Sequence, residues 1–351
     1  MFWYDPTDNR DVYVNTWGEF VPVPTPTPTR TPTPRPGGTG TIIGKVKLQG
    51  RTDYRGVTVR ASGVVATTDA SGAYALASVP VGTFNVTAEM PGYLKHQKSS
   101  VVLTPDAILL LPDVTLLGGD ANNDCMVNIF DLVVVAWNYG STPPSDPRAD
   151  INGNNRVDIF DLVMVGKNLD QACPGSWTSP SASRAQSLQP ADLRVSPAHQ
   201  QVDVDDVFTI TLALEDVSTL YAVDVQLVFN PQVLEVVDAD TLVPDVQIHR
   251  GTFPNPAEGI VTKETADNEA GTIWYVVSLK NPAPPVSGSG TLCSITFRAK
   301  SVGYSGLRIQ SMTLSDASPA ALPGIGHDGA VRVGEWYAFT YLPMLGMRTG
   351  Q

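Results

Sequence analysis

The chain has 351 residues, enough for two or three ordinary domains, and only 17% of them are charged. Its formal net charge of −12 argues against nucleic-acid binding, which needs a basic face. The longest apolar runs are far shorter than the roughly 20 residues that span a bilayer, so we expect no membrane span. With 30 glycines and 29 prolines, the composition favours β-rich domains joined by loops.

The N-terminal region shows no complete domain pattern. Residues 21–36 alternate proline with threonine, which predicts an extended, semi-rigid spacer. We therefore predict a tail and a Pro/Thr linker over residues 1–40. The first residues, Met1–Asp5, lack the basic start and apolar core of a signal peptide. The chain is then either intracellular or the downstream part of a longer exported chain. The domain types described below favour an extracellular or cell-surface location.

Residues 41–117 read as about seven short strands separated by turns, beginning with Thr41–Leu48. This spacing predicts an antiparallel β-sandwich. The stretches Gly72–Leu76 and Val79–Val86 resemble the carboxypeptidase regulatory-like family. That resemblance implies a structural spacer without a site, and we expect its one histidine, His96, to lie in a solvated loop.

Two loops offset by 30 residues, from Asp120 to Asp150, carry oxygen-bearing side chains at alternating positions. An EF-type loop supplies calcium ligands from positions 1, 3, 5, 7, 9 and 12, the seventh through its backbone carbonyl. Each loop brings three carboxylates, so we expect two calcium ions. The predicted ligands are Asp120, Asn122, Asp124, Met126, Asn128 and Asp131 in loop 1, and Asp150, Asn152, Asn154, Arg156, Asp158 and Asp161 in loop 2.

Two alternatives to a pair of calcium loops stay open. Asp/Asn-rich hairpin turns would use the same residue types. The loops could also be degenerate, because position 6, normally glycine, is Cys125 in loop 1 and Asn155 in loop 2. Asparagine tolerates a positive φ more readily than cysteine. Position 8 is apolar in both loops, Val127 and Val157, as expected if the loops pair there.

The duplicated pattern, with Ile-Phe-Asp-Leu at the exit of each loop and helices expected from Asp131 and Asp161, resembles a dockerin over residues 118–172. In dockerins, positions 10 and 11 of each loop contact the partner. The resemblance therefore implies that Ile129, Phe130, Ile159 and Phe160 bind a cohesin, in either of two orientations related by a half turn. The alternative is that these pairs pack inside the module or under a neighbouring domain.

Cys125 and Cys173 flank this dockerin-like module. In such a pseudo-twofold loop pair, the first loop lies near the chain end that follows the last helix, so we predict a disulfide between them. The alternative is two free thiols.

A Ser/Pro/Gly linker is predicted at residues 173–190, and alternating strands fill residues 191–334. The stretches Phe229–Val236, Gly288–Phe297 and Gly329–Val333 resemble a cohesin, the receptor for dockerins. Residues 335–351 form an aromatic C-terminal tail. The sequence thus predicts a multidomain, mainly β protein, in which two β-sandwich or jelly-roll domains flank a small α-helical EF-type calcium-binding module.

These resemblances imply a non-catalytic extracellular adaptor that binds cohesin-bearing and dockerin-bearing proteins, as in a cellulosome-like assembly that degrades polysaccharide. Its dockerin and cohesin could also bind each other, within one chain or between copies. A second hypothesis makes the chain the non-catalytic part of a larger secreted glycoside hydrolase. A third is polysaccharide binding by a sandwich, for which Trp274–Tyr275 is the one hint. No segment is left to hold a catalytic domain, so we expect that the chain is not an enzyme.

Overall fold

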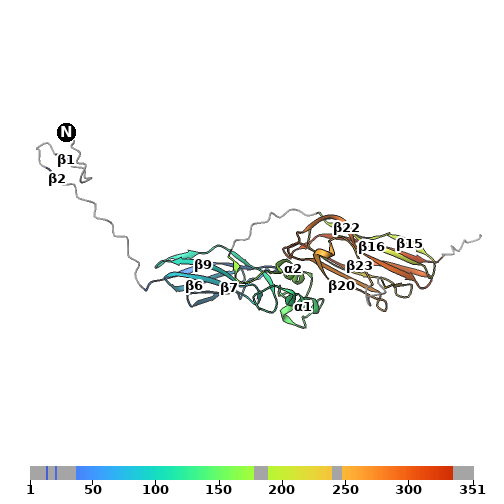
Figure 1. The fold of residues 1–351 in the computed structure, drawn as a ribbon, viewed down its shortest axis with the longest axis horizontal. Coiled ribbons are helices and arrows are strands. Elements are labelled where there is room, and N and C mark those ends of the chain that lie inside the picture. The colour runs from blue at the N-terminus through green and yellow to red at the C-terminus, as the bar shows by residue number, and fades with distance from the viewer. Residues whose placement is uncertain (1–12, 15–19, 22–36, 178–188, 239–246, 335–351) are drawn as a thin grey trace, which may run out of the picture.

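The computed structural model is elongated, with three parts in chain order along its long axis (Figure 1). We call them the first sandwich (37–117), the loop–helix segment (118–172) and the second sandwich (189–334). A short antiparallel pair, β1 (Tyr13–Val14) and β2 (Phe20–Val21), precedes them. The structure describes residues 13–14, 20–21, 37–177, 189–238 and 247–334. The predicted Pro/Thr spacer and the C-terminal tail lie outside these residues.

The first sandwich packs two sheets face to face. One sheet contains β3 (Thr39–Leu48), β6 (Ala73–Pro80), β10 (Ile108–Leu110) and β11 (Val114–Leu116). Burial alternates along β3, as expected for a strand with one face in the core. The other sheet has the order β13 (Gly175–Ser176), β9 (His96–Leu103), β7 (Gly82–Glu89), β4 (Thr58–Ala61) and β5 (Val64–Thr67).

The expectation of a purely antiparallel sandwich is wrong, because β10 and β11 both run parallel to β3. A hairpin between neighbouring strands forces an antiparallel pair. Here the chain instead crosses from β9 in one sheet to β10 in the other, so no hairpin sets the direction of β10. The first sandwich is therefore mixed.

The predicted linker starts later than expected, because residues 175–177 belong to the first sandwich. Gly175–Ser176 pairs parallel with the start of β9, and the buried Trp177 donates from Nε1 to the carbonyl of Pro112 at 2.9 Å. This added strand covers His96, which is 3% exposed and not a solvated loop residue. The expectation for His96 failed because the covering strand comes from distant sequence.

The loop–helix segment contains two α-helices, α1 (Ile129–Asn138) and α2 (Ile159–Asn168), and a 3₁₀ turn, η1 (Pro147–Ala149). Each helix begins two residues before the predicted start. The reason is a capping box, in which Asn128 or Asp158 caps the helix and the aspartate at the third helical position bonds back. A short strand, β12 (Gly118–Asp120), joins the segment to β8 (Gly92–Tyr93) of the first sandwich.

The second sandwich packs a six-stranded sheet against a seven-stranded sheet. The six-stranded sheet contains β14 (Ala191–Ser196), β16 (Val207–Leu220), β18 (Leu234–Val236), β19 (His249–Arg250), β22 (Val286–Ala299) and β25 (Gly324–His327). The seven-stranded sheet contains β15 (His199–Val202), β17 (Ala222–Val228), β20 (Gly259–Asp267), β21 (Thr272–Leu279), β23 (Gly303–Ser315), β24 (Ala321–Leu322) and β26 (Gly329–Val333). A 3₁₀ turn, η2 (Pro256–Glu258), precedes β20.

Within the residues that the structure describes, buried side chains form two hydrophobic cores, and one of the two is confined to a single part. The core of the second sandwich contains the inward side chains of its two sheets. The other core runs from the first sandwich through the loop–helix segment and ends on the second sandwich, at Tyr221, Ala222, Val276, Leu279 and Ala283. The three parts are therefore packed against one another. No helix in the described ranges is long and apolar enough to cross a membrane.

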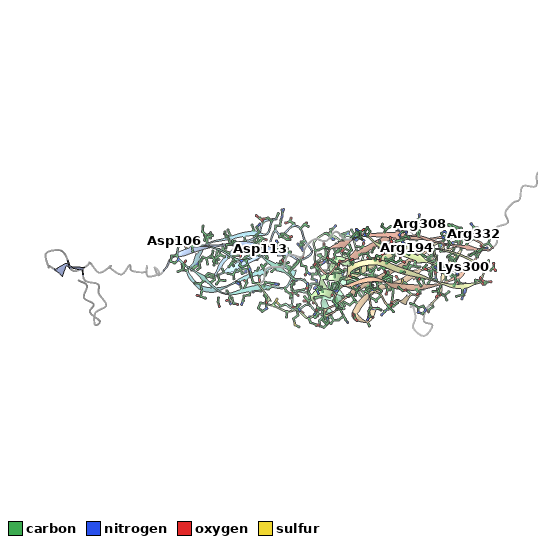
Figure 2. All side chains as sticks on the ribbon, turned by 90° about the horizontal axis from the view of Figure 1, so that it is seen from above. Asp106, Asp113, Arg194, Lys300, Arg308 and Arg332 are labelled. Atoms are coloured by element: carbon green, nitrogen blue, oxygen red, sulfur yellow. A yellow bond between two sulfur atoms is a disulfide. The ribbon has the colours of Figure 1, made fainter. Side chains whose placement is uncertain are left out.

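Charged side chains lie along the whole length of the molecule. Figure 2 shows Asp106 and Asp113 on the first sandwich and several cationic residues on the second. Arg194, one of these cations, is held by Asp192 at 2.9 Å and by Glu215 at 2.7 Å. Its charge is thus neutralised by neighbours on the same sheet.

Candidate functional site

The two predicted calcium loops have the same backbone shape. Position 4 has a positive φ in both loops, 61° at Asn123 and 73° at Gly153. Position 6 does so too, 73° at Cys125 and 67° at Asn155. A loop of this kind must turn sharply so that the oxygen atoms of its ligands surround the position of the ion. Both loops make these turns at the same two positions. Cysteine at position 6 therefore does not prevent loop 1 from adopting the fold of loop 2.

The carboxylates at positions 1 and 12 of loop 1 are buried and held by backbone N–H groups. Asp120 accepts from Asp124 at 3.0 Å and from Cys125 at 3.1 Å. Asp131, which is fully buried, accepts from Asn122 at 3.1 Å and from Asn128 at 2.8 Å. Both carboxylates are thereby fixed in position at the base of the loop.

Loop 2 repeats these backbone hydrogen bonds, with Asp150 half-buried where Asp120 is buried. Asp150 takes the place of Asp120, and Asp161, also fully buried, takes the place of Asp131. Their donors are the backbone N–H groups of Gly153, Asn154 and Asn155 for Asp150, and of Ile151, Asn152 and Asp158 for Asp161. Repetition of the hydrogen bonds in both loops makes a chance resemblance between two Asp/Asn-rich turns a poor explanation.

The buried carboxylates of the loops bear an electrostatic cost. Burial, together with a smaller contribution from neighbouring carboxylates, raises the pKa of Asp161 to about 8 and that of Asp120 to about 6. The pKa values of Asp131 and Asp158 are raised by burial as well. A divalent cation with oxygen preference would remove this cost. The donor set therefore fits calcium.

The remaining predicted ligands line the open side of each loop. Asn128 and Asp158, at position 9, each use one oxygen to accept the N–H of position 11, at 2.8 Å and 3.0 Å. The second oxygen of Asp158 accepts from the Asn154 side-chain amide at 3.3 Å, whereas Asn128 has only the one side-chain oxygen, whose remaining lone pair could face an ion or a bridging water. The outer positions of the two loops are occupied by Asn122, Asp124 and Met126, and by Asn152, Asn154 and Arg156.

The raised pKa values predict how stability depends on pH in the presence of a chelator. Between about pH 4 and pH 8, the folded chain holds more protons on Asp120 and Asp161 than the unfolded chain does, so its stability falls as the pH rises. Calcium needs the carboxylate form, so its stabilising effect should grow over the same range. Thermal unfolding at several pH values, with chelator and with calcium, measures both trends. A melting temperature in chelator that rises steadily from pH 5 to 8 would contradict this account.

The first loop is tied to the chain end after α2. Cys125 and Cys173, the predicted pair, are joined by a disulfide with their Cα atoms 5.2 Å apart. The Cys173 N–H also donates to the Cys125 carbonyl at 2.9 Å. Both sulfurs lie near Asp120, but bonded to each other they are not metal ligands.

The expected pairing of the two loops at position 8 is wrong. Val127 exchanges backbone hydrogen bonds with Asp170 and Gln171 after α2, at 2.8 and 2.9 Å. Val157 does the same with Gly140 and Ser141 after α1, at 2.9 and 3.1 Å. Each loop is thus held by the segment that follows the helix of the other loop, and this crossed arrangement brings Cys173 to Cys125.

Removal of the disulfide should destabilise the loop–helix segment strongly. The two cysteines are 48 residues apart, and closing a loop of that length stabilises the folded chain by about 4 kcal/mol in the chain-entropy model. We expect Cys125→Ser with Cys173→Ser to lower the denaturant midpoint of this segment, measured by hydrogen exchange at α1 and α2. Reduction of the parent should add the mass of two hydrogens, also in a Cys293→Ser background. An unchanged midpoint would contradict the prediction.

The four predicted partner-binding residues differ in exposure. Ile129 and Phe130 at the start of α1 are 57% and 67% exposed. Ile159 at the start of α2 is 1% exposed, and Phe160 packs partly buried against the shared core. The pair on α2 is therefore covered within the chain, and only the pair on α1 is open.

Helix α2 packs against the outer face of the seven-stranded sheet. A Cβ atom at Gly166 would lie 2.8 Å from the Leu279 carbonyl oxygen, so glycine is required for this approach. The Asn281 N–H donates to the Gly166 carbonyl at 2.8 Å, and the Asn281 side chain donates to the Leu169 carbonyl at 3.1 Å. These bonds satisfy carbonyls at the helix end that have no partner within the helix. The Lys167 ammonium lies 5.6 Å from the centroid of the Tyr221 ring.

The end of α1 meets the same sheet through a hydrogen-bonded aromatic pair. The Tyr139 hydroxyl donates to Asp224 at 2.7 Å, and Trp274 Nε1 donates to the other oxygen of Asp224 at 2.9 Å. The two rings are 5.7 Å apart between centroids. Tyr275, the neighbour of Trp274, is 1% exposed inside the second sandwich. The two aromatics that hinted at a polysaccharide platform therefore do not form an exposed row.

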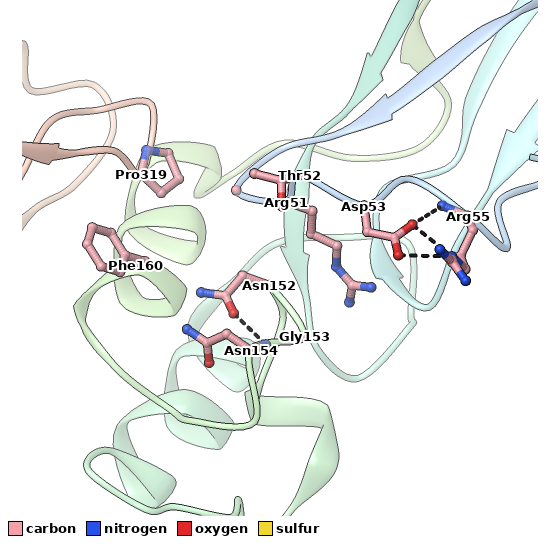
Figure 3. A pocket seen from close by; sticks show the side chains of 10 residues that line it. Arg51, Thr52, Asp53, Arg55, Asn152, Gly153, Asn154, Phe160 and Pro319 are labelled. Atoms are coloured by element: carbon pink, nitrogen blue, oxygen red, sulfur yellow. Dashed lines mark hydrogen bonds and ion pairs between the residues drawn. The ribbon is translucent and has the colours of Figure 1, made fainter. Parts of the chain in front are cut away.

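Loop 2 is also held by the first sandwich. The Arg51 guanidinium donates to the Ile151 carbonyl at 2.7 Å and to the Tyr93 hydroxyl at 3.0 Å. Figure 3 shows Arg51 beside loop 2, with Phe160 and Pro319 on the other side of a groove of about 490 Å³ where all three parts meet. Loop 2 and α2 thus link the two sandwiches.

Sequence reasoning missed the residues that join the parts. These are Arg51, Tyr139, Gly166, Asp224 and Asn281, none of which belongs to a recognisable motif. One signal was present: Gly166 interrupts α2 where α1 has Ala136, and a lone glycine in a helix marks a close approach.

Comparison with known proteins identifies the two sandwiches. Residues 41–117 match the family model of the carboxypeptidase regulatory-like domain, and residues 194–333 match that of the cohesin domain. The comparison with curated proteins returned no match.

Several solved cohesin structures are similar to part of the chain. The non-cellulosomal cohesin from the archaeon Archaeoglobus fulgidus is 15% identical with a TM-score of 0.33, and the match covers 42% of this chain and 93% of that one. A type II cohesin from the cellulosome of Acetivibrio cellulolyticus is 12% identical with a TM-score of 0.35, covering 41% and 95%. A type I cohesin–dockerin complex from Clostridium thermocellum is 15% identical with a TM-score of 0.35, covering 43% and 98%. The two family models show that the chain contains a carboxypeptidase regulatory-like domain and, after the loop–helix segment, a cohesin domain.

Proposed function

We propose that this chain is a non-catalytic extracellular adaptor whose loop–helix segment is a dockerin-like docking module ordered by two calcium ions. The observation that carries the proposal is the repeated set of carboxylates, Asp120 with Asp131 and Asp150 with Asp161, held by backbone N–H groups in two loops of the same shape; three of the four are buried and Asp150 is half-buried. Calcium would neutralise these groups and fix the start of each helix. The disulfide between Cys125 and Cys173 fits an oxidising location outside the cell.

The cohesin domain gives the adaptor a second role as a receptor. Cohesins in the similar solved structures are found in complexes with dockerins, which supports dockerin-bearing proteins as partners of the family. In this chain, α2 already packs on the outer face of the cohesin sheet at Ala222 and Val276, both 0% exposed. We therefore propose that the first docking contact of the adaptor is internal and sets the three parts in one rigid unit.

The two matched domains supply no catalytic site, and the proposal assigns none to the chain. Its contribution to a polysaccharide-degrading assembly would be structural, because the elongated chain would hold other proteins at a fixed distance from one another. The carboxypeptidase regulatory-like domain acts as the spacer at one end, anchored to loop 2 by Arg51.

Calcium titration by calorimetry tests the proposal. The chelator-treated full chain should bind two calcium ions per molecule, and Asp120→Ala with Asp150→Ala should abolish both. The matched control removes two acidic charges from the surface, Asp113→Ala with Glu269→Ala, and should leave the titration unchanged. Absence of calcium binding by the parent chain would refute the calcium-dependent mechanism.

A further inference from the structure

A groove of about 510 Å³ crosses one end of the cohesin domain, over β15, β26 and β23. Its exposed walls are His199 and Gln201 of β15, Arg332 of β26 and Tyr304 of β23. We call it the β15–β26 groove. It lies apart from the contact with α2, because Ala222, where α2 packs, pairs with the last residue of β23, whereas Tyr304 is the second residue of that strand.

The register of the three strands explains why a groove forms. Ala330 of β26 stands opposite Gly306 of β23, so one row of outward positions has no long side chain. The next row holds three long side chains beside one another, those of Gln201, Arg332 and Tyr304. Successive outward rows are roughly 7 Å apart, twice the rise of a strand. The low row is therefore a floor, and the tall row is its wall.

Gly306 keeps this floor low although nothing in the fold requires glycine there. Its φ is not in the left-handed region, and the nearest side-chain atom to an added Cβ would be Cγ of Arg308, at 3.7 Å. The Tyr304 ring leans over Gly306, with Cε1 at 3.9 Å from the same Cβ position, and it is still 59% exposed. A glycine inside a strand often marks the close approach of a ligand. The open ring beside it offers an apolar face for that ligand to pack on.

Positive charge gathers at this groove, although the chain has a formal net charge of −12. The Arg332 side chain forms one wall, and the stem of Arg308 lies beside Gly306 (Figure 2). The Arg308 side chain has no ion pair or hydrogen bond with any residue that the structure describes. A guanidinium matches the planar geometry of a carboxylate and can bind it through two hydrogen bonds. The groove thus suits a ligand that carries an acid group.

The backbone of the floor cannot recognise an extended peptide. Strand β26 is paired with β15 on one side and with β23 on the other, so its N–H and C=O groups are already used. Peptides that bind to sheets do so by adding a strand at a free edge. A ligand in the groove must instead be recognised by side chains, through a flat apolar face, hydroxyl groups and a carboxylate. Sugar acids combine these three features.

We propose that the β15–β26 groove binds an acidic glycan, a chain of sugar rings that carry carboxylates. The Tyr304 ring packs on the apolar face of one sugar ring. Arg308 and Arg332 hold its carboxylate, and the imidazole of His199 and the amide of Gln201 bond to its hydroxyl groups. The inference goes beyond the proposed docking function and does not rest on it, because the groove uses neither the calcium loops nor α2.

Calorimetry of the full chain with trigalacturonate, a trisaccharide of sugar acids, tests the proposal. We expect one trisaccharide to bind per chain, about ten-fold or more tighter than galactotriose, which lacks the carboxylates. Arg308→Gln with Arg332→Gln should abolish binding. The matched control removes two cations from the first sandwich, Lys45→Gln with Arg60→Gln, and should leave binding unchanged.

Two further variants separate a shaped site from a general cationic patch. Gly306→Leu should fold, because its Cβ has space, and should fill the floor of the groove. Tyr304→Ala removes the ring. Each should weaken trigalacturonate binding by about ten-fold or more, as for the central residues of other binding sites. Binding that survives in both variants, or hexaglutamate binding as tightly as trigalacturonate, would overturn the proposal. So would no binding by the parent chain, and the calcium titration would still test the docking function separately.

Discussion

Substitution of Asp161 by alanine should abolish calcium binding in loop 2 and release α2 from both sandwiches. Asp161 is fully buried and accepts three backbone N–H groups, from Ile151, Asn152 and Asp158, at 2.9, 3.1 and 3.0 Å. Each buried donor left without a partner costs about 1–3 kcal/mol, so we expect a loss of about 3–5 kcal/mol in addition to the lost ion. Calorimetry with calcium should then report one site.

The structural consequence of Asp161→Ala follows from what loop 2 touches. The Ile151 carbonyl accepts a hydrogen bond from Arg51 of the first sandwich. The Gly166 carbonyl of α2 accepts one from the Asn281 N–H of the cohesin domain. Amide exchange at Asn281, which bonds to α2, should become fast. The matched control is Asp131→Ala in loop 1, which should also remove one calcium ion but leave the Asn281 amide protected. Equal exchange rates of the Asn281 amide in the two variants would contradict the proposal that loop 2, and not loop 1, holds α2 on the cohesin domain.

A glutamate at Gly166 should separate the cohesin domain from α2 without unfolding either. The added Cβ would stand 2.8 Å from the Leu279 carbonyl, and the charge would face that oxygen across a buried contact. Overpacking alone costs about 1–3 kcal/mol, and the two hydrogen bonds from Asn281 would be lost with it. Removal of a glycine from a helix interior favours the helix itself. The loss of stability is therefore confined to the contact between α2 and the cohesin domain.

Small-angle scattering and exchange at Asn281 measure that separation. The Gly166→Glu chain should show a broader distribution of distances than the parent and a fast Asn281 amide. The equivalent change in the other helix, Ala136→Glu, places the same charge on α1 and should leave both readouts at parent values. If the parent and the Gly166→Glu chain scatter alike, α2 does not hold the cohesin domain.

Much of this architecture is predictable from the sequence, because local patterns determine it. Alternating strands such as Thr41–Leu48 indicate a sandwich, and the two family resemblances drawn from such stretches agree with the family models. The loop residues Asp120 and Asp150 mark the turns, because the same spacing recurs in register. The capping aspartates Asp131 and Asp161 then fix where each helix starts, within two residues.

What could not be predicted depends on contacts between distant segments. Ile129 and Ile159 follow identical loop positions, yet one is exposed and the other buried. No local pattern distinguishes them, since the difference arises from a sheet that lies about a hundred residues downstream. His96 is similar: its burial requires Gly175, which joins the sheet from beyond the loop–helix segment. The lone Gly166 was the one local sign of the contact at α2.

The central claim is that calcium orders the loop–helix segment so that α2 docks on the cohesin domain. Hydrogen exchange at the Asn281 amide, measured on the unmodified full chain across a calcium titration, tests it most directly, since this amide donates to the Gly166 carbonyl across the contact. The account predicts slow exchange with two calcium ions bound and fast exchange in chelator. Protection of Asn281 that is equal with and without calcium would contradict it.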